Sequence, residues 1–240
     1  LSGDAGDELF GGYNRYLLAN KYWKYFKFSP FFLRKKIAKL LTSVPLNISM
    51  NFINILSSTE FSGSKENNLS KILNKAMLIR DKQSFYTSMT NEWTKEDGIM
   101  NFTKDINDFN FLEIFKNNKK IDFEEAMMKA DFQSYLPDDI LCKVDRSSMF
   151  YSLETRAPFL NKDVINFAFN LPLRFKIRDG ETKWILKEVL SKYIPKDLYE
   201  RPKQGFGIPI SKWMRGELKE WVNDMLSDEI LNSHNLFEKS

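Results

Sequence analysis

The sequence predicts a mainly α-helical protein. Apolar residues recur with the i, i+3, i+4, i+7 spacing that marks the buried face of a helix. Three stretches have this spacing: Phe123/Ala126/Met127/Ala130, Leu186/Val189/Leu190/Tyr193 and Leu218/Trp221/Val222/Met225. Alternating runs of β-branched residues are rare, so strands should be short or absent. We expect these three helix faces to belong to the core.

Composition excludes several classes of site. The 240 residues are 42% apolar and 28% charged, as in an ordinary globular protein large enough to bury a core. Cys142 is the single cysteine, which suits a reducing cytoplasm, and no stretch reaches the roughly 18 apolar residues of a membrane span. One Cys and one His cannot supply the roughly four ligands of structural zinc. His234, near the C-terminus, should lie on the surface.

Residues 9–59 contain no Asp or Glu and interleave lysines and arginines with aromatic residues. A helix should run to about Lys27 and stop at Pro30, and a second should cover residues 31–43. We favour an amphipathic helix with a basic solvated face and an aromatic buried face. Nucleic-acid binding through residues 9–39, by phosphate contact and base stacking, is the less favoured alternative. Residues 57–71 are predicted to form an exposed loop.

The opening residues "SGDAGDE" form the most informative motif. Gly3 and Gly6 allow a tight turn and the close approach of a ligand. A helix starting at Asp7 and Glu8 would favour an anion, but the carboxylates oppose one unless a divalent cation lies between them. The loop therefore suits Mg²⁺ with pyrophosphate, with one carboxylate left to act as a base. The alternative is a helix start capped by Asp, without a ligand.

Three ordered blocks resemble the synthetase domain of glutamine-dependent asparagine synthetases. The first, "SGDAGDELFGGYNRY", is similar to the family's S-G-x-G-x-D-E-x-F-G-G-Y signature. The second is "LPDDILCKVDRSSMFYSLETRAPFLN", and the third runs from "GETKWILKEVL" through "RPKQGFG". Together they frame residues 1–16 and 136–214, whereas the stretch between matches only loosely.

The resemblance implies a helical C-terminal portion of an α/β, ATP-pyrophosphatase-like synthetase domain. Residues 1–16 would form the pyrophosphate and magnesium loop, 17–120 a helical insertion and 121–226 the helical substrate half. The 240 residues contain no S-G-G-x-D-S phosphate loop, and Cys142 cannot be the family's N-terminal glutaminase nucleophile. We therefore expect further segments upstream and no activity from this chain alone.

The resemblance also implies a reaction and its cofactors. Family members use Mg²⁺ and ATP to adenylate a carboxylate, usually the β-carboxylate of aspartate, and ammonia from glutamine then forms the amide. Asp4 occupies the position of a Glu implicated as a base, and its shorter side chain leaves that role open. The implied site residues are Ser2, Gly3, Gly6 and Lys203 for ATP and pyrophosphate, Asp7 for metal, and Asp4 and Lys203 for catalysis.

Two clusters within the second block keep competing interpretations. Glu154 and Arg156 could form a buried ion pair that locks a helix end to the core, which we favour over contact with substrate. Asp138, Asp139, Asp145 and Arg146 lie on or near one predicted helix, where they could line the substrate pocket or form salt bridges among themselves. Arg146 is the candidate ligand for an aspartate carboxylate, because its guanidinium pairs with carboxylates through two hydrogen bonds.

Alternative functions remain at this stage. A relative could amidate a different acid, such as a sugar acid, on the same scaffold. The chain could also be a non-catalytic helical interaction module, and a homodimer is possible in either case.

Overall fold

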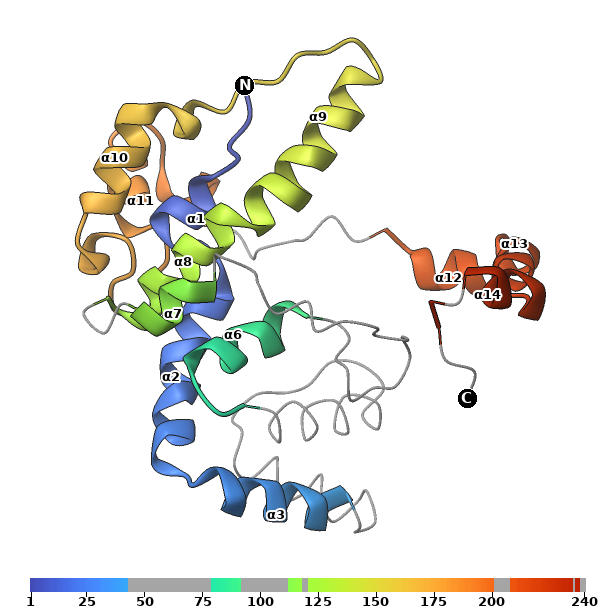
Figure 1. Ribbon diagram of the computed structural model, residues 1–240. Helices are drawn as coiled ribbons and strands as arrows, with labels where there is room; N and C mark the ends of the chain where they lie inside the picture. Colours follow the sequence, from blue (N-terminus) through green and yellow to red (C-terminus); the bar gives the residue numbers. More distant parts are fainter. Residues whose placement is uncertain (43–78, 92–111, 118–120, 201–207, 235, 238–240) are drawn as a thin grey trace. The chain divides into compact units, whose positions relative to one another are not determined.

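The computed structural model describes residues 1–42, 79–91, 112–117, 121–200, 208–234 and 236–237 (Figure 1). Among these residues no strand forms beyond isolated bridges, such as the one between Arg178 and Glu181. The prediction of a mainly helical protein is confirmed. The chain divides into two compact units, residues 1–90 with 109–189 and residues 91–108 with 190–240.

The first unit contains most of the described helices. Its N-terminal helices are α1 (Gly6–Phe10), α2 (Asn14–Phe28) and α3 (Phe31–Thr42). The later ones are α6 (Lys82–Thr90), α7 (Glu113–Asn117), α8 (Phe123–Gln133), α9 (Cys142–Met149), α10 (Lys162–Asn170) and α11 (Trp184–Leu190), whose last residue belongs to the second unit. The predicted break at Pro30 is confirmed, because α2 ends at Phe28 and α3 begins at Phe31.

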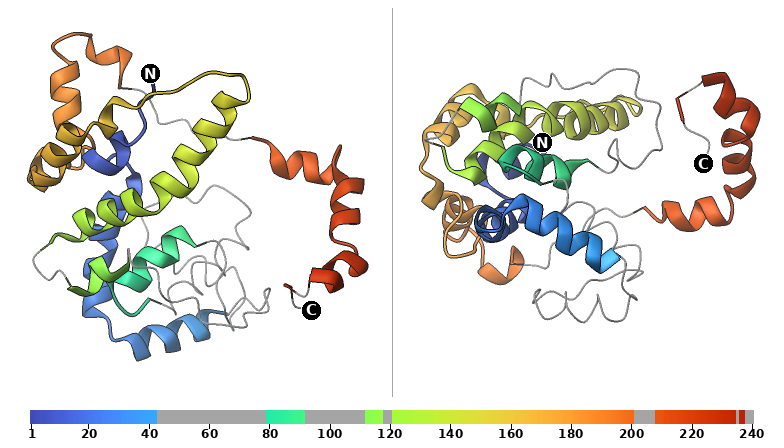
Figure 2. Two further views of the ribbon diagram at one scale, coloured as in Figure 1. Left: turned by 45° about the horizontal axis from the view of Figure 1, so that its top comes forward. Right: turned by 60° about the horizontal axis from the view of Figure 1, so that its bottom comes forward.

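A long helical rod crosses the first unit. A π-helix over Leu136–Leu141 joins α8 to α9, so these three elements follow one another with hardly a break (Figures 1 and 2). Short π-helical segments are rare and occur often at functional sites. This segment carries Asp138 and Asp139, the two adjacent acids that the sequence singled out.

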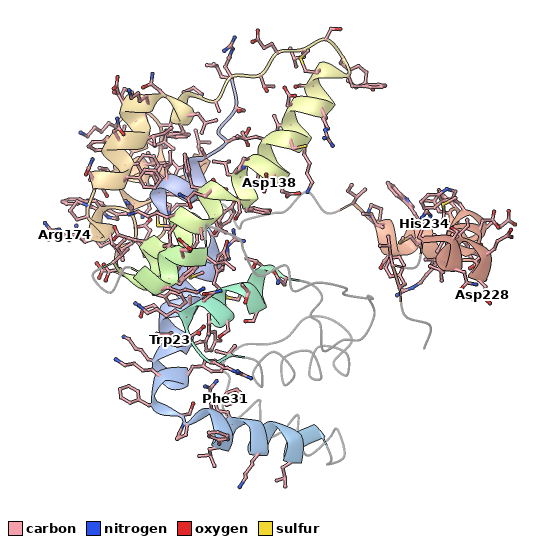
Figure 3. All side chains as sticks on the ribbon, in the orientation of Figure 1. Trp23, Phe31, Asp138, Arg174, Asp228 and His234 are labelled. Carbon is pink, nitrogen blue, oxygen red and sulfur yellow. The ribbon has the colours of Figure 1, made fainter. Side chains whose placement is uncertain are left out.

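One core cluster lies where α2, α6 and α8 meet. Tyr16, Phe85, Tyr86, Phe123 and Met127 are all buried there. Trp23 of α2 adds an edge-to-face contact with the Phe85 ring, with 6.1 Å between the ring centroids (Figure 3). Aromatic pairs of this geometry add to the stabilisation that burial provides. The first of the three predicted helix faces, in α8, is thus confirmed as core.

A second cluster encloses α1. Leu9 and Phe10 of this five-residue helix are buried against Leu136 of the rod and Ala168 of α10. The Phe10 ring also contacts Phe159, with centroids 5.6 Å apart. Since so short a helix is unstable by itself, this packing holds the opening loop in place.

The second unit contains α12 (Ile210–Arg215), α13 (Lys219–Met225) and α14 (Asp228–His234). Trp221 of α13 is 55% exposed, and Leu218 and Met225 are exposed as well. The core prediction for this helix face was therefore wrong, as it was for Val189, Leu190 and Tyr193. Periodicity identifies an apolar face, but burial requires a second element to cover it. His234 is exposed, as predicted.

The basic N-terminal stretch is an amphipathic helix, as favoured. Trp23 and Phe26 of α2 pack against the core, whereas Lys21, Lys24 and Lys27 are exposed. Phe28 at the end of α2 and Phe32 in α3 are exceptions, because their side chains are exposed. The predicted loop over residues 57–71 lies outside the described residues.

Candidate active site

The opening loop enters α1 through a left-handed residue. Ala5 precedes the helix with φ 69° and ψ −8°, is buried, and makes no side-chain hydrogen bond to the helix. The alternative of a helix start capped by Asp is therefore wrong. A left-handed backbone favours glycine because a Cβ crowds it. This geometry explains why the family pattern has glycine where this chain has Ala5.

The two loop glycines have different surroundings. A Cβ on Gly6 would come within 3.2 Å of the Phe159 ring, so packing accounts for this glycine. A Cβ on Gly3 would meet no atom within 4 Å, and Gly3 does not have a positive φ. The fold itself therefore does not require glycine at position 3. A ligand that approaches the backbone closely would require it.

Asp4 carries a buried polar atom without a partner. Its Oδ2 is shielded from solvent and accepts no hydrogen bond among the described residues. Burying an unpaired carboxylate oxygen is unfavourable, and such atoms are rare in folded proteins. The orphaned oxygen is the observation in this loop that most directly points to an absent ligand.

The loop is fastened to the segment that follows the rod. The Ser2 N–H donates a hydrogen bond of 2.8 Å to the Arg156 carbonyl. Figure 1 shows the N-terminus beside the connection between α9 and α10. The first and second sequence blocks therefore meet at this loop, through residues 154 positions apart.

Asp7 pairs with a lysine that sequence reasoning did not assign. The Lys183 Nζ lies 3.0 Å from Asp7 Oδ2, and both side chains are half-buried. Lys183 has φ 55°, a left-handed conformation that is uncommon for lysine. It belongs to the "GETKW" stretch of the third block, but no spacing in the sequence indicates that it contacts Asp7.

A partly buried network of polar side chains connects α1 to α8. Tyr13 donates a hydrogen bond of 2.7 Å to Glu8, whose pKa is raised by burial. The Arg15 guanidinium lies over the Tyr13 ring, 4.2 Å from its centroid, and pairs with Asp131 of α8 at 2.8 Å. Through these contacts the residues that follow α1 are tied to the rod.

The candidate substrate residues lie along the rod. Asp138 is exposed on the π-helix (Figure 3), and Asp139 pairs with Lys143 at 2.5 Å. Arg146 is exposed on α9, and its guanidinium makes no hydrogen bond or ion pair within the described part of the chain. The structure therefore does not join Arg146 to the opening loop, and its role stays a prediction.

The structure tests one further site prediction, the ion pair in the second sequence block. Arg156 and Glu154 do form an ion pair, but their side chains are 75% and 69% exposed. The predicted buried ion pair is therefore wrong, because the segment between α9 and α10 runs over the surface. Lys203 lies outside the described residues.

The donor set suits a divalent cation that arrives with phosphates. Within the described ranges, no group of three or more His, Cys, Asp or Glu side chains could hold a metal. Mg²⁺ needs only one or two protein carboxylates when phosphates supply its other ligands. The Asp7 carboxylate already binds one positive charge, the Lys183 ammonium, and the unpaired Asp4 oxygen is a second acceptor for a cation. The loop thus fits Mg²⁺ in this limited sense and forms no metal cage of its own.

In enzymes that act on nucleotide phosphates, one or two protein carboxylates commonly hold the Mg²⁺ that the phosphates also bind. The sequence pattern described as "Asparagine synthase" matches residues 1–240. The chain belongs to the asparagine synthase family, a family of ATP-dependent ligases.

Two relatives show how far the sequence similarity extends. Asparagine synthetase [glutamine-hydrolyzing] 1 of Bacillus subtilis is 28% identical over 239 residues, which is 95% of this chain and 33% of that protein. Asparagine synthetase [glutamine-hydrolyzing] 2 of rice is 26% identical over 130 residues, 50% of this chain and 22% of that protein. The chain spans about a third of the length of the Bacillus relative. No solved structure matches it.

No helix within the described residues is long and apolar enough to cross a membrane.

Proposed function

We propose that this chain contributes to an ATP-dependent ligase that adenylates the β-carboxylate of aspartate and then forms the amide with ammonia. Family membership supports the reaction class. The observation that carries the site assignment is the buried, unpartnered oxygen of Asp4 beside Gly3, where the backbone is open to a ligand. The unpaired oxygen of Asp4 is unfavourable for folding, and folding does not require a glycine at position 3. A bound ligand would account for both features.

The loop residues have distinct proposed roles. The Ser2–Gly3 backbone contacts ATP, and the Asp7 carboxylate binds the Mg²⁺ that accompanies the pyrophosphate. Mg²⁺, when bound, neutralises charge on the phosphates. Asp4 accepts a proton from the attacking ammonia, a role that its position beside the open backbone favours. Gly6 acts indirectly, because its contact with Phe159 sets the position of α1.

Two residues complete the proposal. Lys203 stabilises the charge that develops on the phosphates as the adenylate forms. Arg146 binds the α-carboxylate or β-carboxylate of aspartate through its exposed guanidinium. ATP, aspartate and ammonia released from glutamine are the small-molecule partners, and the ATP requirement suits a cytoplasmic enzyme.

Product analysis tests this proposal. The full-length product of the gene is incubated with aspartate, ATP, Mg²⁺ and ammonium, and asparagine and AMP are measured by mass spectrometry. We expect both products in equal amounts, and a loss of at least about tenfold in Asp4→Asn and Asp7→Asn. Asp163→Asn, in the exposed first turn of α10, is the matched control and should keep full activity.

The same assay separates the alternatives. Formation of AMP with a sugar acid, and not with aspartate, would move the proposal to a relative with a different acceptor. Absence of AMP with every acid tested, in a folded protein, would favour a non-catalytic helical module. We expect the 240-residue chain by itself to form no asparagine.

A further inference from the structure

The ion pair between Asp7 and Lys183 is built into the fold in an unusual way. Lys183 adopts a left-handed backbone with φ 55°, which an L-residue with a long side chain rarely adopts. Hydrogen bonds on both sides hold it there: Trp184 N–H donates to the Lys176 carbonyl at 2.9 Å, and Lys187 N–H donates to the Lys183 carbonyl at 3.1 Å. A residue kept in an unfavourable conformation beside a candidate site is a candidate for function.

The Asp7 and Lys183 side chains pack directly against the backbone of Gly12. A Cβ at position 12 would overlap both the Asp7 carboxylate and the Lys183 side chain. The Gly12 N–H also donates a hydrogen bond of 2.8 Å to the Asp7 carbonyl. The side chain of Lys183 therefore crosses directly over the backbone that follows α1, and its ammonium ends at the carboxylate proposed to bind metal.

The neighbouring lysine does not share this arrangement. Lys187 lies four residues after Lys183, within α11, and pairs with Glu181 at 2.8 Å. Lys183, just before α11, and Lys187, within it, thus neutralise different carboxylates. Lys187 provides a matched control, because it has the same charge and a comparable ion pair away from the opening loop.

Competition follows from the chemistry of this pair. A single carboxylate cannot be fully neutralised by an ammonium and by a divalent cation at once without the two cations repelling each other. A lysine side chain is a compact charge on a flexible stem, so it can leave one oxygen and reach another. A phosphate chain bound with the metal would offer such oxygens.

We propose that Lys183 is a positioning residue that acts as the resident counter-ion of Asp7. In the absence of ligand its ammonium holds the Asp7 carboxylate and competes with a divalent cation. When Mg²⁺ enters with pyrophosphate, Asp7 passes to the metal and Lys183 pairs with a phosphate oxygen. Metal binding is thereby made dependent on the phosphate ligand. This inference rests on the proposed function, because it takes Asp7 as the metal ligand.

Binding of Mn²⁺, followed by electron paramagnetic resonance, tests the inference without measuring catalysis. The full-length gene product and its Lys183→Met variant are titrated with Mn²⁺, first alone and then with pyrophosphate. In Lys183→Met we expect Mn²⁺ alone to bind about three- to tenfold tighter, since the variant removes the competing ammonium of a half-exposed pair. With pyrophosphate present, we expect binding about tenfold weaker than in the wild type.

Three further variants make the result specific. Lys183→Arg should restore the binding of Mn²⁺ with pyrophosphate, and it serves if Lys183→Met folds poorly in a thermal melt. Lys187→Met should leave both titrations unchanged. In the Asp7→Asn background, adding Lys183→Met should no longer change either titration.

The opposite results would overturn the inference. Unchanged or weaker binding of Mn²⁺ alone in Lys183→Met would show that the ammonium does not compete for Asp7. A lack of Mn²⁺ binding in the wild type and in every variant would show that Asp7 binds no metal for which Lys183 could compete. Failure of the proposed function would be distinct: the protein would form no AMP with any acid, although the opposite effects of Lys183→Met on the two titrations persisted.

Discussion

Arg15 of α2 and Asp131 of α8 lie 116 residues apart in the sequence and form an ion pair of 2.8 Å. The Asp131 side chain is completely buried, and it also accepts hydrogen bonds from Tyr16 at 2.6 Å and from Tyr86 at 2.7 Å. Three helices thus meet at one carboxylate. Because Arg15 also stacks on Tyr13, whose hydroxyl binds Glu8 of α1, this carboxylate anchors the opening loop.

Asp131→Asn should strongly destabilise the first unit. The substitution removes the buried negative charge and leaves Arg15 without a neutralising partner, a change that usually costs about 3–5 kcal/mol. Chemical denaturation followed by circular dichroism measures the free energy of unfolding. Asp163→Asn, at an exposed position of α10, is the control and should change it by less than about 1 kcal/mol. A loss below about 1 kcal/mol in Asp131→Asn would contradict this account of the network.

Two glycine substitutions should separate folding from binding. Gly12→Ala should lower the melting temperature, because its Cβ would overlap the Asp7–Lys183 pair, and overpacking of this kind costs about 1–3 kcal/mol. Gly3→Ala should leave the melting temperature unchanged, because its Cβ meets open space. Gly3→Ala should nevertheless weaken Mg-ATP binding by the full-length protein in calorimetry. Equal ATP affinity in Gly3→Ala and the wild type would remove the backbone contact from the proposed site.

Glu124 should make stability depend on pH. Burial raises its pKa above the ordinary 4.5, while hydrogen bonds from its own backbone and from Asn20 oppose the shift. The folded state therefore binds the proton more tightly than the unfolded state. The corresponding stability is fully present below pH 4.5 and is lost as the pH rises through the folded-state pKa.

Comparison with Glu124→Gln isolates this effect. The unfolding free energy of the wild type minus that of Glu124→Gln should decrease as the pH rises above 4.5 and then level off. Glu113→Gln, at an exposed position of α7, controls for the general effect of losing a charge. A difference that increased with pH would mean that Glu124 is better stabilised as an anion than its burial implies.

The exposed pair of Glu154 and Arg156 should contribute little to stability. Ion pairs open to solvent are usually worth about 0–1 kcal/mol, because water and salt screen them. Glu154→Gln should therefore change the unfolding free energy by less than about 1 kcal/mol. A rise in the KM for the acid substrate at unchanged stability would favour the interpretation of this segment as a substrate contact.

The sequence predicted the helices better than their burial. The spacing of Phe123, Ala126, Met127 and Ala130 identified α8 and its buried face, and Pro30 marked the end of α2. The same spacing in α13 produced an exposed face, since periodicity within one helix carries no information about what covers it. The left-handed backbone of Ala5 was also invisible, because alanine itself gives no signal of a positive φ.

The candidate site was only partly accessible to sequence reasoning. Glycines and carboxylates in "SGDAGDE" suited a phosphate and metal loop, but a capped helix start explained them as well until the family resemblance was added. The contact between Asp7 and Lys183 could not be predicted, because it joins residues 176 positions apart through the packing of the intervening helices. Asp131 was missed for the same reason. An isolated acid within a helical stripe has no local feature that distinguishes a buried anchor from a solvated charge.

The exchange of labelled pyrophosphate into ATP tests the central claim most directly, because it detects adenylation separately from amide formation. We predict that the full-length gene product catalyses exchange only when aspartate is present, and that Asp7→Asn abolishes it. Asp4→Asn should retain exchange but form no asparagine, since Asp4 is proposed to act in the second half-reaction. Exchange without any acid, or no exchange with aspartate or any other acid in a folded protein, would contradict the account.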